Sequence, residues 1–512
     1  MNCSIKRMCF PFVLLTVVSS LAWSNDYSQY PKAKDTIESV PDNILTPNTV
    51  DTRLGKLNFE NGMPDDKTTQ LVFDNLDFQR GMNVFLDAIP VASLQAFKEG
   101  LASIGVNDHN HYAVWMSRMD SSSLLLTPNT ESVYGIGWLD LKAGPLVLET
   151  PPNVLGLLDD AAFQYIGDVG NAGPDKGQGG KYLVIGPDWQ GDYDVSNYTA
   201  VYHSKSYGVW FPMRGFQGDD QGATAVKNFA EKFKMYRLGE VPKKPELINA
   251  AGTKMNTIHA NDYDFYHEIN DTVQYEHPDF LNKETMGLIN AIGIIKGQAF
   301  APDQRMENIL RDAAAVANAT ARAQLFHFRN EEQYLYQGKH WFNAFGGNAG
   351  YKMELADTGG RALDVRTAFH YAYTGITPAM DLKLVGAGAQ YGVAVKDSEY
   401  RSFNGKNTYH LHIPANVPVE NFWSVVLYDV QHRSELITPQ KFPSLTSYSE
   451  NLAVNRDGSI DIYMSPEAPK GKANNWIQTD PNTNWFTVFR AYGPKQAWFD
   501  QTWQLNDIKR ID

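Results

Sequence analysis

Two histidines separated by a single residue, His410 and His412, are the sharpest chemical feature of this sequence. Side chains alternate between the two faces of an extended strand, so both imidazoles would lie on one face of Tyr409–Ile413. Such a pair can chelate a metal ion or take part in catalysis, as in jelly-roll metalloenzymes. The carboxylate that usually follows soon afterwards is displaced here, because Glu420 lies beyond two prolines. An ordinary polar face of a sheet is therefore the alternative interpretation.

Charged residues beside apolar strands are the second group of candidates. Asp429 follows the apolar run 422–428, and Arg490 lies two residues after Val488, on the same face of a later strand. A buried arginine needs an acidic partner, which could be Asp429 or a carboxylate of a substrate. Glu131 directly precedes a predicted strand and could act as a general acid or base in a cleft. These three residues join the two histidines as candidate catalytic residues.

Three aromatic residues near the C-terminus are candidates for ligand binding. Trp423 and Tyr428 belong to the apolar run, and Trp476 follows two asparagines in a predicted loop. Their rings could stack on a sugar or on an aromatic molecule, although packing in the core is the ordinary role of such side chains. Trp476 is the one that we expect to be exposed.

The elements that would position these residues are short strands in the last fifth of the chain. The run 422–429 is apolar on both faces, which is typical of a strand that is buried on both sides. Asp457-Gly458 between two alternating runs indicates a hairpin. Strands of this kind predict a β-sandwich or a jelly roll. Residues 112–214 also have the pattern of strands, whereas 222–329 have the spacing of amphipathic helices.

Several long motifs carry a resemblance to a known pair of domains. The motifs NTYHLHIP, FWSVVLYD, DGSIDIY and FRAYGP resemble the domain of unknown function 1214. The upstream motifs LLLTPNTESVYGIGWLDL and GPLVLETPP resemble its usual N-terminal companion, the domain of unknown function 1254. The resemblance implies a secreted bacterial protein with two β-rich domains, the second a jelly roll, and helices between them. It implies no particular reaction and no catalytic residues.

These observations predict a multidomain α+β protein in which a mainly α-helical segment joins two β-sandwich or jelly-roll-like domains. Helices are expected at 68–86 and 93–104, with Pro90 ending the first region. The predicted organisation is a signal peptide (1–24), an extended N-terminal arm (25–66), an N-terminal β-rich domain with leading helices (67–220), a helical bridge (221–340) and a C-terminal jelly-roll domain (341–512).

The N-terminus has the composition of a cleavable signal peptide. Lys6 and Arg7 precede the apolar run 8–21, and small residues place the cleavage near Ser24. Both cysteines fall within this segment, so the mature chain would hold neither a disulfide nor a thiol nucleophile. No later stretch is long and apolar enough to span a membrane. We therefore expect a periplasmic or secreted protein.

The net charge and the absence of several motifs argue against some classes of function. The formal net charge of −13 argues against a nucleic-acid partner. The sequence lacks the nucleophile elbow of hydrolases, the zinc motif His-Glu-x-x-His and a phosphate-binding loop. It does not identify a cofactor.

Three hypotheses for the function stay open. The first is a hydrolase-like enzyme that acts on a small polar or aromatic molecule in a cleft between the domains. The second is a non-catalytic protein that binds carbohydrate or another ligand. The third is a secreted interaction or virulence-associated protein. The proline-rich arm could assemble a homo-oligomer in each case.

Overall fold

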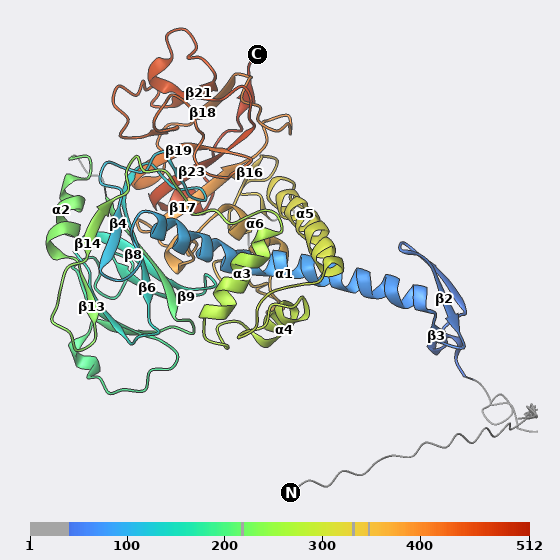
Figure 1. The fold of residues 1–512 in the computed structure, drawn as a ribbon. Helices are drawn as coiled ribbons and strands as arrows, with labels where there is room; N and C mark the ends of the chain where they lie inside the picture. Colours follow the sequence, from blue (N-terminus) through green and yellow to red (C-terminus); the bar gives the residue numbers. More distant parts are fainter. Residues whose placement is uncertain (1–39, 217–219, 330–332, 347–348) are drawn as a thin grey trace, which may run out of the picture. The chain divides into compact units, whose positions relative to one another are not determined.

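The computed structural model describes residues 40–216, 220–329, 333–346 and 349–512. They form a mixed α+β structure with several sheets (Figure 1). The chain separates into two compact units, one ending at Phe73 and the other running from Asp74 to Asp512. The predicted signal peptide lies outside the described residues.

The first unit contains a small antiparallel sheet of three strands, which are β1 (Thr49–Thr52), β2 (Gly55–Glu60) and β3 (Met63–Pro64). The 3-10 helix η3 (Asp42–Ile44) precedes it. The hairpin between β2 and β3 turns at Asn61-Gly62, whose φ angles of 51° and 87° suit a two-residue turn of this type. The described part of the predicted extended arm, residues 40–66, therefore contains paired strands.

Helix α1 (Asp66–Ser103) passes through Pro90 without ending. The prediction of two helices separated at Pro90 is therefore wrong. A proline inside a helix costs about 3 kcal/mol. Fully buried apolar side chains on both sides of it, such as Phe85 and Phe97, offset this cost, because each contributes roughly 2 kcal/mol.

Two sheets of the N-terminal part pack face to face around a shared apolar core that includes Tyr112, Leu148 and Phe211. The larger sheet has the strand order β14-β4-β6-β12-β8-β9, and the smaller has β11-β10-β7-β13. Their strands are β4 (His111–Val114), β6 (Ser132–Asp140), β7 (Leu146–Glu149), β8 (Val154–Asp160), β9 (Tyr165–Gly170), β10 (Lys181–Ile185), β11 (Ala200–His203), β12 (Gly208–Phe216), β13 (Lys234–Arg237) and β14 (Glu246–Asn249). A further pair joins β5 (Ser123–Leu124) to β15 (Met255–Asn256).

The segment predicted as a helical bridge combines helices with strands. It contains β13, β14 and β15, which pair with N-terminal strands, and most of the remaining helices. Its helices are α2 (Ala223–Lys232), α3 (Asp264–Tyr275), α4 (Lys283–Ala291) and α5 (Gln304–Phe326). The helices α6 (Leu363–Ala372) and α7 (Gln496–Phe499) follow later in the chain. Asp303 caps α5, because its carboxylate accepts a hydrogen bond from the backbone N–H of Met306 at 2.8 Å. Within the described ranges, no helix is both long and apolar enough to cross a lipid bilayer.

Two further sheets form the C-terminal part and enclose a second apolar core, which includes Leu411, Trp423 and Phe489 (Figure 1). Their strand orders are β16-β17-β23-β19-β20 and β22-β21-β18-β24. The strands are β16 (Trp341–Phe342), β17 (Ala389–Ala394), β18 (Tyr409–Ile413), β19 (Val419–Asp429), β20 (Ser444–Thr446), β21 (Ile460–Ser465), β22 (Trp476–Gln478), β23 (Trp485–Pro494) and β24 (Lys509–Arg510). β21 and β22 pair in parallel, so the strand order does not establish a jelly roll.

Strand β19 is buried on both faces, as its sequence predicted. Val425 and Leu427 face the core between the two C-terminal sheets. Val426 and Tyr428 face the opposite way, toward a core that also contains residues of α1, α3, α5 and α6. The five-stranded sheet therefore lies between the C-terminal sandwich core and the remainder of the second unit.

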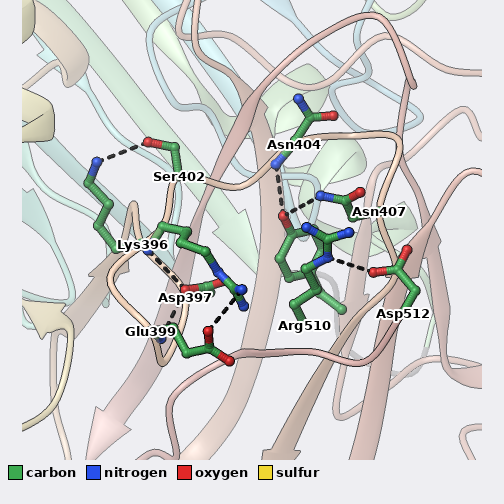
Figure 2. Close-up of polar contacts among 10 residues, drawn as sticks. Lys396, Asp397, Glu399, Ser402, Asn404, Asn407, Arg510 and Asp512 are labelled. Carbon is green, nitrogen blue, oxygen red and sulfur yellow. Dashed lines mark hydrogen bonds and ion pairs between the residues drawn. The ribbon is translucent and has the colours of Figure 1, made fainter.

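The loop between β17 and β18 is held by its own polar contacts (Figure 2). The buried carboxylate of Asp397 accepts hydrogen bonds from the backbone N–H groups of Glu399 and Arg401, each at 2.9 Å. Lys396 Nζ donates to Ser402 Oγ at 2.9 Å. These contacts fix the path of the chain just before the strand that carries the two histidines.

Candidate functional site

An open cavity lies between the six-stranded sheet of the N-terminal part and the five-stranded sheet of the C-terminal part. It holds about 1020 Å³ of empty space, including its mouth. Both sheets belong to the second compact unit. The cleft expected between the two domains thus exists as a geometric feature.

Strand alternation explains the first wall of the cavity. Trp210, Pro212 and Arg214 of β12 share one face and line the cavity, whereas Phe211 and Met213 between them enter the core of the N-terminal sandwich. The neighbouring strand β6 contributes Tyr134 and Ile136 to the same wall, and β8 contributes residues 155–157. Tyr134 stands directly opposite Arg214 in the register of the two strands.

The second wall has the same design. Val488 and Arg490 of β23 line the cavity, which confirms the prediction that they share a face. β17 adds Ala389 and Tyr391. Tyr391 lies opposite Arg490 in the antiparallel pairing. Each wall therefore carries one arginine with a tyrosine as its cross-strand neighbour.

The segment that follows α6 lines the cavity between these walls, from Tyr373 to Met380. The Thr377 hydroxyl donates to Asp168 Oδ1 at 2.6 Å. The backbone N–H of Ile376 donates to Asp159 Oδ2 at 2.8 Å. These bonds attach the segment to β8 and β9 of the N-terminal sheet.

Asp168 is the acidic side chain that lines the cavity. Burial raises its pKa above the ordinary value, although hydrogen bonds from Thr377 and Tyr165 oppose the shift. Burial also raises the pKa of Asp159 well above its ordinary value, and the proximity of Asp168 and Asp160 adds to that rise. These carboxyl groups therefore keep their protons to higher pH than exposed aspartates do.

Arg490 is buried, and its two terminal nitrogen atoms donate to protein atoms. Its guanidinium donates to the Tyr428 hydroxyl at 2.7 Å and to the carbonyl oxygen of Thr127 at 2.8 Å. A longer bond of 3.4 Å reaches the carbonyl oxygen of Pro128. Its hydrogen bonds therefore go to these groups and not to Asp429.

Glu131 lies behind the cavity wall, close to Arg490. Burial raises its pKa, while the charge of Arg490 and a hydrogen bond from Thr130 oppose the shift. Glu435 is buried nearby, and its pKa is raised by burial and by the proximity of Glu131. Glu131 therefore belongs to an internal acidic pair and does not line the cavity.

Arg214 has different surroundings from Arg490. Among the described residues, no hydrogen bond or ion pair reaches its guanidinium, which lies 5.9 Å from the centre of the Tyr134 ring. Its strongest electrostatic neighbours are the side chains of Tyr134, Tyr391 and Tyr492, followed by Arg490. Arg214 is thus a cation that faces the cavity without an acidic partner among the described residues.

The two histidines lie on β18, away from the cavity lining. His410 Nε2 and His412 Nδ1 each lie 2.8 Å from Oδ1 of Asp461, which is on the neighbouring strand β21. Both side chains are partly exposed. In the part of the chain that the structure describes, no group of three or more histidine, cysteine, aspartate or glutamate side chains is arranged to hold a metal ion.

The remaining predicted residues have structural contacts. Asp429 Oδ1 accepts hydrogen bonds from the backbone N–H groups of residues 431 and 432 and thereby fixes a turn. Tyr428 donates its hydroxyl to the carbonyl oxygen of Pro128 at 2.5 Å. Trp423 is buried in the core of the C-terminal sandwich. Trp476 is partly buried, and its indole N–H donates to the carbonyl oxygen of residue 465.

The fold therefore brings together Arg490, Tyr428 and Glu131, and it separates them from the other predicted residues. Sequence reasoning missed Arg214 and Asp168. The signal for Arg214 was available, because it is the charged residue in an otherwise apolar strand whose alternation predicts one face. No sequence pattern indicates that Arg214 faces the second sheet, because the two sheets come from segments far apart in the chain.

Comparison with known proteins supports the family resemblance. The family described as protein of unknown function DUF1254 matches residues 106–237, and the family described as protein of unknown function DUF1214 matches residues 388–496. The two domains therefore occur in the predicted order. No curated protein matches the chain.

Two solved structures match this chain to different degrees. The VPA0106 protein from Vibrio parahaemolyticus is 16% identical, with a TM-score of 0.51 over 85% of this chain and 100% of that one. A putative uncharacterized protein from Burkholderia cenocepacia is 9% identical, with a TM-score of 0.38 over 87% of this chain and 97% of that one. The Vibrio protein shows a shared fold and says nothing of function.

The two cavity arginines should differ in their effect on stability. We expect Arg490→Met to lower the free energy of unfolding by about 3 kcal/mol, because buried carbonyl groups and the Tyr428 hydroxyl lose their donor. Arg214→Met is the matched control and should change stability by less than about 1 kcal/mol, because no hydrogen bond or ion pair from the described residues would be lost. Urea unfolding followed by circular dichroism measures both. Equal losses in the two variants would contradict the distinction.

Asp461 should contribute stability that depends on pH. Burial would raise its pKa, but hydrogen bonds with His412, Asn455 and His410 lower it from 3.8 to about 2. A carboxyl group with a lowered pKa in the folded state stabilises at higher pH, and this contribution disappears as pH falls from about 4 to about 2. The loss of stability in Asp461→Asn should therefore be full above about pH 5 and small near pH 2.

The control for this prediction is Glu467→Gln, which removes an exposed carboxylate. Urea unfolding at a series of pH values gives the difference in free energy between each variant and the wild type. A loss in Asp461→Asn that is as large at pH 2 as at pH 6 would show that the carboxylate charge is not its cause.

Proposed function

We propose that this is an exported bacterial protein that binds a small, largely apolar or aromatic molecule in the cavity between its two β-rich parts. The open, mainly apolar cavity is the observation that carries the proposal. Ligand sites in proteins are commonly concave, apolar and lined by a few well-placed polar groups. The proposed export rests on the N-terminal segment of the sequence.

The cavity lining supports an apolar or aromatic ligand. Side chains such as Phe97, Leu157, Trp210 and Phe345 give it a hydrophobic surface. Contact with these groups would remove apolar surface of a ligand from water, which contributes about 25 cal/mol per Å². The polar groups that line it include Arg214, which lies opposite Tyr134 in the pairing of β12 with β6.

A neutral aromatic probe tests the proposal. N-phenyl-1-naphthylamine, whose fluorescence rises in apolar surroundings, should bind the purified protein with a stoichiometry of about one per chain, as expected of a single cavity. Thr374→Trp places a large ring in the cavity lining and should weaken binding by about tenfold or more, because the probe loses its space. Met380→Trp is a second blocking variant at another point of the lining.

Fluorescence titration measures the affinity, and circular dichroism shows whether each variant is folded. Unchanged binding in two folded blocking variants would place the probe outside the cavity. Absence of binding to the wild-type protein would contradict the proposed function.

Hydrolase-like catalysis is the second candidate function, and Asp168 is the observation that favours it. A carboxyl group that lines an apolar cavity and has a raised pKa can serve as a general acid. Its bond with the Thr377 hydroxyl would hold it in place.

Catalysis predicts turnover of small alkyl esters of aromatic acids that depends on Asp168. Asp168→Asn should lower the rate of hydrolysis of ethyl benzoate by about 100-fold, because the side chain can no longer give a proton to the ethoxide that leaves when water attacks the carbonyl carbon. The wild-type rate should fall as pH rises above the raised pKa of Asp168, since the acid form is then lost. Asp279→Asn, a change of an exposed side chain, is the control. A wild-type rate equal to that of Asp168→Asn at every pH would contradict catalysis by Asp168 and leave ligand binding as the proposed function.

A further inference from the structure

We propose that the ligand carries one acidic group, a carboxylate or a sulfonate, and that Arg214 receives it. This inference rests on the proposed function, because it specifies the chemical class of the molecule in the same cavity. Three observations carry it. The described residues offer the guanidinium of Arg214 no hydrogen bond or ion pair, tyrosine hydroxyl groups lie beside it, and the donors of Arg490 are directed to protein atoms.

Arg214 is a charged group in a costly position. A guanidinium that is partly removed from water loses hydration, and this loss is offset only when an anion or other acceptors replace the water. Among the described residues, no acceptor or carboxylate does so. Because Arg214 lines the cavity, a bound anion is the group that could occupy this position. The planar fork of a guanidinium also matches the two oxygen atoms of a carboxylate.

The tyrosine hydroxyls beside Arg214 are oriented as donors. Asn129 Nδ2 donates to the hydroxyl oxygen atoms of Tyr134 and Tyr492, at 3.0 and 2.9 Å. A third hydrogen bond supports this orientation of the amide, because Asn129 Oδ1 accepts a hydrogen bond from the backbone N–H of Glu131 at 3.2 Å. Each hydroxyl oxygen thus accepts a hydrogen bond, and its own hydrogen remains available for an acceptor. Tyr134 lines the cavity next to Arg214, so an anion there would find a second donor.

The charges around the cavity also favour an anion. Arg490 adds a second positive charge on the opposite wall, but its donors are directed to carbonyl groups and to Tyr428. The lining therefore holds two arginines, Arg214 and Arg490, against one carboxyl group, that of Asp168. In a chain with a net charge of −13, this local excess of basic side chains favours an anion.

A matched pair of probes tests the inference. N-phenyl-1-naphthylamine and 8-anilinonaphthalene-1-sulfonate share the same two aromatic groups, and only the second carries an anion. Wild-type protein should bind the sulfonate more tightly than the neutral probe. Arg214→Met should weaken binding of the sulfonate by about ten- to a hundredfold and change binding of the neutral probe by less than about twofold.

Three further variants separate the contributions of the Arg214 charge, its forked geometry and the Tyr134 hydroxyl to binding of the sulfonate. Arg214→Lys keeps the charge and should retain part of the preference for the sulfonate, but not the forked geometry. Tyr134→Phe removes one hydrogen-bond donor. It should weaken binding of the sulfonate by about fivefold and leave binding of the neutral probe unchanged. Arg456→Met removes the same charge at an exposed position and should affect neither probe.

The outcomes distinguish this inference from the proposed function. Binding of the neutral probe by all variants, with the sulfonate unaffected by Arg214→Met, overturns the anion site and leaves the apolar cavity as a ligand site. Equal weakening of both probes in folded Arg214→Met assigns Arg214 to the shape of the cavity and also overturns the anion site. Failure of the wild type to bind either probe overturns both proposals.

Discussion

The cavity depends on the hydrogen bonds that Arg490 and Tyr428 make with the carbonyl groups of Thr127 and Pro128. These bonds join the C-terminal sheet to the segment that leads into the N-terminal sheet. Thr127 has a left-handed backbone with φ of 40°, and its hydroxyl donates to the carbonyl oxygen of Ala372 at 2.9 Å. A non-glycine residue keeps such a conformation only when its surroundings stabilise it. The same contacts therefore hold the two walls of the cavity together at one end.

The two arginines show how the same side chain can serve folding or binding. Arg490 and Arg214 each lie on a strand that faces the cavity, and each has a tyrosine opposite it. The donors of Arg490 are used within the protein, which makes it part of the structure. Arg214 has no such partner among the described residues, so its charge is available to a ligand. We therefore assign a stabilising role to Arg490 and propose a binding role for Arg214.

Local sequence patterns predicted the elements and their faces well. The double-sided burial of β19 and the shared face of Val488 and Arg490 both follow from the alternation of side chains along a strand. The same reasoning failed at Pro90, where buried contacts along α1 outweigh the local cost of the proline. It also offered Asp429 as one possible partner of Arg490, whereas the hydrogen bonds of Arg490 go to the Tyr428 hydroxyl and to the carbonyl groups of residues 127 and 128. Contacts with distant parts of the chain determined both the continuity of α1 and the partners of Arg490.

The partners of a side chain cannot be read from its own strand. Arg490 meets a carbonyl group 363 residues away, and the two histidines meet Asp461 about 50 residues later on another strand. Patterns assign a face, whereas the tertiary fold decides whether a charge on that face is satisfied. The importance of Arg214 becomes clear only when the partners of the charged side chains are known, because it is a cation that the described residues leave without an acidic partner. Leaving it so costs stability in the free protein. That cost is offset when a bound anion supplies the acceptors, and this links the unsatisfied charge in the cavity wall to the binding of an acidic ligand.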